Sequence, residues 1–271
     1  MIRAREATAF ALLPVVLAGI VWLPGWVYLT IIWVFSLMAT WELLTLDRKL
    51  GQPVLVVPSL FAVAAALPAL WILGRAHAGA VLAAVVLLLP VVYLFTRRPI
   101  EGASSAIAGS VFGAVYFVVA GGAMGLLRTE FSGPLGVKVV LTHCITVWAG
   151  DSGAFYLGSM IGRHRLAPRV SPKKSWEGVV GGTLMTFFGV WLCKTVFFDE
   201  LGWPQALAIG AILSFLAPIG DLVESLFKRD AGVKDSSDLI PGHGGFLDRT
   251  DSLFYAAPFV LALLLAFGPR P

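Results

Sequence analysis

Residues 79–95 read GAVLAAVVLLLPVVYLF and contain no charged side chain. The hydrocarbon core of a bilayer is about 30 Å thick, and a helix that crosses it needs roughly 20 apolar residues. Runs of this kind recur along the chain of 271 residues, of which 58% are hydrophobic and 13% charged. A soluble domain of this length could not bury so much apolar surface. The sequence therefore predicts an all-α, polytopic integral membrane protein.

The apolar runs predict nine transmembrane helices. They cover residues 7–23, 26–44, 53–73, 79–95, 103–127, 136–161, 178–198, 203–227 and 248–267. Basic residues precede the first run, as in a secretory signal, but no cleavage site of the A-x-A type follows the run before Trp26. We therefore interpret the first run as a retained helix.

The basic residues are distributed unequally between the segments that join these helices. If the N-terminus is cytoplasmic, fifteen of the twenty Lys and Arg residues lie on the cytoplasmic side. The other five are Arg75, Arg128, Lys138, Lys194 and Arg270. By the positive-inside rule, this asymmetry predicts a cytoplasmic N-terminus and a C-terminus on the opposite side.

The acidic residues divide the chain into two parts. Residues 1–127 form N-terminal transmembrane helices with hardly any polar residue at mid-membrane depth, whereas residues 128–271 concentrate the acids. The second part also contains two long cytoplasmic loops, at residues 162–178 and 228–248. We therefore expect the second part to be the catalytic region.

Asp151 lies about fifteen residues into the predicted helix 136–161. At 1.5 Å per residue, this position is some 22 Å along the helix. A carboxylate is costly at that depth unless it faces a polar cavity or a cation. Asp151 is therefore a candidate functional residue.

Two further predicted helices carry polar stripes, because their polar residues follow i, i+3, i+4, i+7 spacing and share one helical face. The stripes are Asp221, Glu224, Ser225 and Lys228 in one helix, and Asp248, Asp251, Ser252 and Tyr255 in the other. One alternative is that the acids are helix-end charges that reach the interface or face a helix dipole. Their concentration favours a divalent cation between them.

The ligand types favour a hard cation. Cys144 and Cys193 lie inside apolar runs without a partner at zinc-like spacing, so we interpret them as inert buried thiols. Carboxylate ligands select an ion such as Mg²⁺, which commonly binds one or two carboxylates together with substrate phosphates. The expected substrate therefore carries phosphate.

Basic and glycine-rich segments complete a candidate phosphate site. The basic residues concerned are Lys173, Lys174, Lys228, Arg229 and Arg249. The segment Pro241–Gly245, PGHGG, would let backbone N–H groups approach phosphate oxygens. Alternatively, basic loops bind anionic lipid head groups, and His243 is a turn residue.

Residues 225–251, SLFKRDAGVKDSSDLIPGHGGFLDRTD, resemble the signature of the phosphatidate cytidylyltransferase family. The matching positions are Ser225, Lys228, Arg229, Lys234, Asp235, Ser237, Ile240, Pro241, His243, Gly244, Gly245, Phe246, Asp248, Arg249 and Asp251. Residues 151–154, 171–178 and 220–225 are also similar to the family, so the resemblance covers about the last 120 residues.

The resemblance implies transfer of a cytidylyl group from CTP to phosphatidic acid, which yields CDP-diacylglycerol and pyrophosphate. It also implies a homodimer, and a two-cation site, with Mg²⁺ as one cation, held by the acids that match Asp221 and Asp248. On this interpretation Asp151, Asp251 and Glu224 are further metal ligands, and Lys174, Lys228, Arg229 and Arg249 neutralise phosphate charge. The expected substrate-binding residues are Ser171, Lys173, Ser175, Ser225, Lys234, Asp235, His243, Gly244 and Gly245.

We expect a multi-pass protein of the inner (plasma) membrane whose active site faces the cytoplasm, with membrane lipids as partners and no nucleic acid. The alternatives are a CTP-dependent lipid kinase, a cytidylyltransferase acting on another lipid phosphate, and a cation or phosphate transporter. Transporters often have two related halves with broken helices, and this sequence shows no such symmetry.

Overall fold

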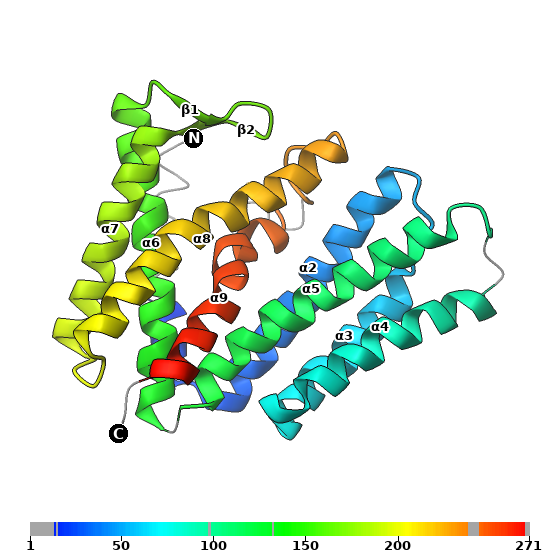
Figure 1. The fold of residues 1–271 in the computed structure, drawn as a ribbon, viewed down its shortest axis with the longest axis horizontal. Helices are drawn as coiled ribbons and strands as arrows, with labels where there is room; N and C mark the ends of the chain where they lie inside the picture. The colour runs from blue at the N-terminus through cyan, green and yellow to red at the C-terminus, as the bar shows by residue number, and fades with distance from the viewer. Residues whose placement is uncertain (1–13, 15, 97–98, 132, 238–243, 269–271) are drawn as a thin grey trace. The chain divides into compact units, whose positions relative to one another are not determined.

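A computed structural model describes residues 14, 16–96, 99–131, 133–237 and 244–268 (Figure 1). Seven helices in this part of the chain are long and apolar enough to cross a membrane. These helices confirm the prediction of an all-α, polytopic membrane protein. The first expected helix, residues 7–23, lies largely outside the described residues.

The helices follow the predicted apolar runs closely. The structure contains α2 (Gly25–Lys49), α3 (Val56–Leu73), the short 3₁₀ helix η1 (Arg75–His77), α4 (Ala78–Phe95), α5 (Ala103–Thr129), α6 (Pro134–Ile161), α7 (Trp176–Val196), α8 (Trp203–Asp230) and α9 (Leu247–Phe267). Helix α6 has 28 residues but is not among the seven apolar helices, since His143 and Asp151 interrupt its apolar run.

The chain forms two compact units. The first unit consists of Met1–Thr129 and Phe227–Thr250, and the second of Glu130–Leu226 and Asp251–Pro271. The segment between α8 and α9 therefore packs with the N-terminal helices.

Helix α5 is the centre of the first unit, because it packs against α2, α3 and α4. Small residues allow this close approach: a Cβ atom placed on Gly113 would lie only 2.9 Å from Leu44 Cδ2. A hydrogen bond of 2.7 Å from Leu55 N to Ser110 Oγ joins the start of α3 to α5. The apolar core of the unit includes Leu67 and Val118.

In the second unit, α6 and α7 lie side by side along glycine-rich faces (Figure 1). A Cβ atom on Gly181 would lie 2.5 Å from Leu157 Cβ and 2.6 Å from Gly153 O. Small residues at such positions let helix backbones approach closely. Helices α8 and α9 are equally close at Gly220, where a Cβ atom would lie 2.6 Å from Tyr255 Cβ.

A short antiparallel hairpin connects α6 to α7. Its strands are β1 (Arg165–Ala167) and β2 (Ser171–Ser175), with Arg165 opposite Ser175. The hairpin lies within the segment 162–178 that the sequence indicates only as a loop. It brings Lys173 and Lys174 to the beginning of α7.

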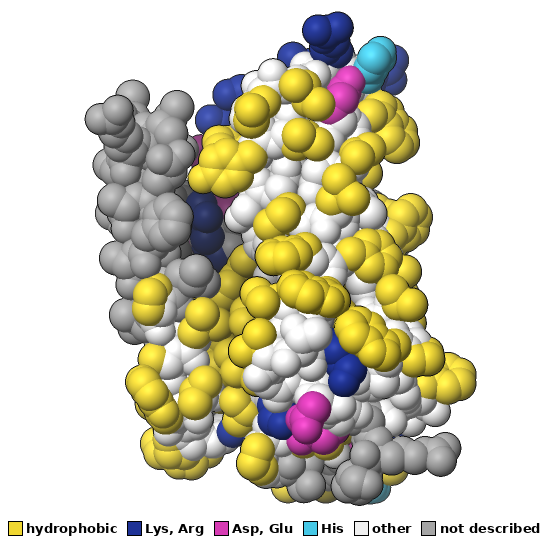
Figure 2. Space-filling view, turned by 90° about the vertical axis from the view of Figure 1, so that its left-hand side faces the viewer, with side chains coloured by type: hydrophobic (Ala, Val, Ile, Leu, Met, Phe, Trp, Pro, Cys, Tyr) yellow, Lys and Arg dark blue, Asp and Glu magenta, His cyan; other side chains and the backbone are white. Residues whose placement is uncertain are grey.

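The outer face of the second unit is largely apolar. Exposed residues of α7 include Leu184, Phe188 and Trp191, at i, i+4, i+7 spacing. Figure 2 shows hydrophobic side chains over much of this face, and charged side chains at its upper and lower ends. This distribution is expected of a lipid-facing wall that ends at a membrane surface.

Candidate functional site

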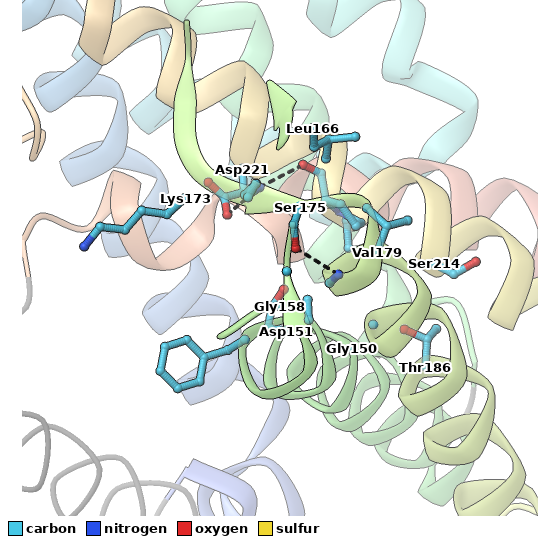
Figure 3. Close-up of a pocket in the computed structure, with 18 of the residues that line it drawn as sticks. Gly150, Asp151, Gly158, Leu166, Lys173, Ser175, Val179, Thr186, Ser214 and Asp221 are labelled. Atoms are coloured by element: carbon cyan, nitrogen blue, oxygen red, sulfur yellow. Dashed lines mark hydrogen bonds and ion pairs between the residues drawn. The ribbon is translucent and has the colours of Figure 1, made fainter. Parts of the chain in front are cut away.

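Lys174 and Asp221 form the charged centre of the second unit. Lys174 Nζ lies 2.8 Å from Asp221 Oδ2 and donates a 3.3 Å hydrogen bond to Pro218 O. Ser225 Oγ donates to the other oxygen of Asp221 at 3.3 Å. Asp221, Ser225 and Pro218 all belong to α8, so β2 supplies the base and α8 supplies the acid. Figure 3 shows Asp221 beside the end of the hairpin.

Two more acids lie in electrostatic range of this pair. Asp151 of α6 interacts with Asp251, Asp221 and Lys174. The close approach of α8 and α9 brings Asp251 to this position, since a Cβ atom on Gly220 would lie 2.7 Å from Asp251 O. Three helices therefore each contribute one carboxylate near Lys174. The excess negative charge is suited to a bound cation.

A cavity of about 510 Å³ opens beside these residues (Figure 3). Its volume falls in the range of roughly 300–1,000 Å³ that is typical of ligand pockets. Asp151, Lys174 and Asp221 line it, while Val147 and Leu213 contribute apolar wall. The cavity thus combines charged groups with an apolar lining, which suits an amphiphilic ligand.

The hairpin residues that the sequence predicts for substrate binding occupy different environments. Ser175 is buried and its Oγ accepts a 3.1 Å hydrogen bond from Gly178 N, so it is the N-cap of α7. Lys173 is exposed and extends away from Asp221 (Figure 3). Ser171 is half-buried at the start of β2. Lys174 is therefore the hairpin residue that contacts the acids.

The first unit contains a second charged centre, at Asp248. Its carboxylate pairs with Lys228, and both side chains are only 10% exposed. It also accepts hydrogen bonds from Ser236 N at 3.0 Å, Ser236 Oγ at 2.7 Å and Gly245 N at 2.9 Å. Asp248 is thus held by one ammonium group and three uncharged donors.

Glu42 of α2 belongs to the same network, although the sequence interpretation does not include it. Its carboxylate accepts hydrogen bonds from Ser236 Oγ at 2.9 Å and from Leu247 N at 2.7 Å. It is only 1% exposed. The feature of the sequence that could have identified Glu42 is its ionisable side chain inside the predicted transmembrane run 26–44. Such residues are rare in membrane helices unless they have a function.

The remaining predicted site residues are dispersed. Arg229 donates a 2.7 Å hydrogen bond to Val233 O, beyond the end of α8. Lys234, Asp235 and Arg249 are exposed, and Glu224 is buried in α8. Gly244 has a φ of 75°, a conformation that favours glycine. His243 lies outside the described residues.

The predicted metal ligands fall into both units. Asp151, Asp221, Asp251 and Glu224 belong to the second, and Asp248 belongs to the first. Within the described ranges, the structure has no group of three or more His, Cys, Asp or Glu residues arranged to hold a metal ion. The shared two-cation site stays a prediction. The oxygen donors of Asp151, Asp221 and Asp251 do have the chemistry that Mg²⁺ prefers.

Comparison with known proteins identifies the relatives of this chain. A model described as "Cytidylyltransferase family" matches residues 3–267. A phosphatidate cytidylyltransferase of Mycobacterium bovis is 33% identical over 279 aligned residues, which cover 97% of this chain and 89% of the relative. Proteins with the same name from Haemophilus influenzae and Pseudomonas aeruginosa are each 44% identical, over 46% and 50% of this chain. The chain spans about half the length of these last two relatives, 44% and 50% respectively.

Proposed function

Because this chain belongs to the cytidylyltransferase family, we propose that it transfers a cytidylyl group from CTP to phosphatidate. The products are CDP-diacylglycerol and pyrophosphate. The observation that carries the proposal is the family match over residues 3–267, which includes all but a few residues at each end. The names of the relatives support the choice of phosphatidate as the lipid substrate.

In this reaction a phosphomonoester oxygen of phosphatidate attacks the α-phosphorus of CTP. A new P–O bond forms there, and the bond from the α-phosphorus to the bridging oxygen breaks and releases pyrophosphate. A phosphomonoester has a second pKa near 6 and is largely a dianion at neutral pH, so the attack needs no strong base. The main task of the protein is to reduce the repulsion between the two anions.

The cavity of the second unit supports this proposal. Its ammonium group on Lys174 can neutralise phosphate charge, and such fixed charges are most effective where water is excluded. Its apolar lining, with Val147 and Leu213, suits the hydrophobic part of a lipid substrate. We assign the phosphate of the substrate to the end of the cavity at Lys174.

We also propose that the reaction requires Mg²⁺, with a second cation as the family resemblance implies. A bound divalent cation supplies charge stabilisation to the attacking and leaving oxygens. Asp151, Asp221 and Asp251 support its binding, because they bring three carboxylates to the region of Lys174, and carboxylate oxygens are ligands that Mg²⁺ prefers. Chelation with EDTA should abolish turnover, and added Mg²⁺ should restore it.

We infer that the protein lies in the inner membrane with its active site facing the cytoplasm, and the charge distribution supports this orientation. Arg165 and Lys173 on the exposed hairpin are among the basic residues that the positive-inside rule assigns to that side. The family resemblance also implies a homodimer, which mass measurement of the detergent-solubilised protein tests.

The direct test uses purified protein with CTP, Mg²⁺ and phosphatidate, followed by chromatography of the lipid fraction. We expect a liponucleotide, and its formation should fall strongly in Lys174→Met, which removes the ammonium group beside Asp221. Arg169→Met, on an exposed residue between β1 and β2, is the matched control and should retain activity. If folded wild-type protein forms no liponucleotide, the proposed function is wrong.

A further inference from the structure

Glu42 is a buried acid whose hydrogen-bond partners are about 200 positions away in the sequence. It lies on α2, and its carboxylate oxygens accept hydrogen bonds from Ser236, Ser237, Phe246 and Leu247. All five residues belong to the first compact unit. A residue of the N-terminal helices thus holds both sides of the segment between α8 and α9.

The two oxygens are satisfied in the same way. Oε1 accepts from Ser237 Oγ at 2.6 Å and from Phe246 N at 3.0 Å. Oε2 accepts from Ser236 Oγ at 2.9 Å and from Leu247 N at 2.7 Å. Each oxygen therefore has one hydroxyl and one backbone N–H within hydrogen-bond distance.

The two backbone donors lie at the start of α9, which begins at Leu247. The first N–H groups of a helix have no partner within the helix, and the helix dipole favours negative charge there. Glu42 therefore performs, from a different helix, the function of an N-terminal cap. The next residue of α9 is Asp248.

Gly245 allows this approach. A Cβ atom on Gly245 would collide with both carboxylate oxygens of Glu42 and with Ser236 Oγ. The N–H of the same residue donates to Asp248 at 2.9 Å. A side chain at this position would therefore displace the Glu42 carboxylate or the Ser236 hydroxyl.

Ser236 connects Glu42 to Asp248. Its hydroxyl oxygen lies 2.9 Å from Glu42 Oε2 and 2.7 Å from Asp248 Oδ2, and its backbone N–H also donates to Asp248. A hydroxyl has one proton, so the two carboxylates share a single donor at this point. The orientation of Asp248 beside Lys228 consequently depends on the position that Glu42 gives to Ser236 and to the start of α9.

We propose that Glu42 is a positioning residue, which fixes the orientation of Asp248 and Lys228 for the reaction. The catalytic part of this inference rests on the proposed function, whereas the positioning itself does not. Glu42 is not assigned a contact with the substrates. It acts through Ser236 and through the first turn of α9.

The test variant is Glu42→Gln, which keeps the shape of the side chain but replaces one oxygen with an NH₂ group. Whichever oxygen is replaced, the NH₂ group faces a backbone N–H and cannot accept a hydrogen bond from it. The amide that faces the NH₂ group, Phe246 or Leu247, loses a charged acceptor, so we expect its hydrogen exchange to accelerate by at least about 10-fold.

The same variant should lower kcat by about 10-fold and leave KM for CTP and phosphatidate within about twofold, because the loss affects orientation more than binding. Ser236→Ala is a second variant for the event that Glu42→Gln does not fold. It removes only the shared hydroxyl, and we expect it to lower kcat in the same direction. The matched control is Glu101→Gln, an exposed acid of the same unit, which should change neither measurement.

Faster exchange at Phe246 or Leu247 together with a lower kcat supports the proposal. Unchanged exchange in Glu42→Gln overturns it. Faster exchange with unchanged kcat and KM also overturns it, because Glu42 would then have only a structural role. If the wild-type protein has no activity with CTP and phosphatidate, the proposed function fails, and the exchange measurement still decides whether Glu42 holds the start of α9.

Discussion

Replacing Lys228 with methionine removes the ammonium group that pairs with Asp248 and preserves most of the length of the side chain. Both side chains of the pair are 10% exposed, so solvent screens their attraction weakly. Removal of one partner from a buried ion pair costs about 3–5 kcal/mol. Asp248 retains the donors on Ser236 and Gly245, so we expect the lower end of this range, about 3 kcal/mol.

Thermal unfolding of the purified protein in detergent, followed by circular dichroism, measures this loss. For a protein of this size, 1 kcal/mol shifts Tm by roughly 2–4 °C, so about 3 kcal/mol predicts a decrease of roughly 6–12 °C. The matched control is Lys138→Met. Lys138 pairs with Glu200 at 2.8 Å, but the Glu200 side chain is 38% exposed, and such surface pairs contribute little.

The double variant Lys228→Met/Asp248→Asn supplies a further check. It removes both charges, so its Tm should be higher than the sum of the two single effects predicts. If Lys228→Met lowers Tm no more than Lys138→Met does, the pair in the first unit does not stabilise the fold, and the reasoning from its burial is wrong.

Three other predictions concern the site, the orientation and the hairpin. Asp221→Asn and Asp248→Asn should each lose at least about 10²-fold in turnover while the protein still inserts, because the proposed cation would lose a charged ligand and a catalytic metal supplies several kcal/mol. Near-normal turnover would exclude the altered residue from the proposed metal site. Lys173→Cys should react with an impermeant thiol reagent from the cytoplasmic side, and Arg128→Cys from the opposite side. The native cysteines are buried and should not react. The reverse pattern would contradict the orientation. Ser175→Ala should lower the free energy of unfolding by about 1 kcal/mol, since it removes the N-cap of α7, and an unchanged Tm would contradict that role.

The helices could be predicted from the sequence because their apolar runs match the thickness of a bilayer. The predicted run 248–267 corresponds to α9, Leu247–Phe267, and the run 79–95 to α4, Ala78–Phe95. The end of α8 is predicted less accurately. The apolar run ends at residue 227 and therefore predicts a loop from residue 228, whereas the helix continues to Asp230. Its last turn contains the charged residues Lys228 and Arg229, which an apolar pattern does not include.

The acids of the second unit were also within reach of sequence reasoning. Asp151, Asp221 and Asp251 occur in apolar helices, where a carboxylate is costly without a function. The pairing of Lys174 with Asp221 was not predictable, because it depends on the hairpin that turns the chain between α6 and α7. The strands of this hairpin have three and five residues, too few for a clear alternating pattern.

Glu42 shows the limit of local pattern reading. Its partners are 194 to 205 residues away, so no spacing rule within one helix connects them. Only its charge in an apolar run was visible in the sequence. The packing of Phe227–Thr250 with the N-terminal helices is a tertiary feature, and it gives this charge its partners.

The phosphorus atom of CTP that the lipid acquires is the most direct test of the central claim. Purified protein is incubated with phosphatidate, Mg²⁺ and CTP labelled at either the α- or the γ-phosphorus, with Asp248→Asn as the blank. Cytidylyl transfer predicts that the α-label appears in the lipid fraction and that the γ-label leaves as pyrophosphate. A γ-label in the lipid would identify a CTP-dependent kinase and contradict the proposed function.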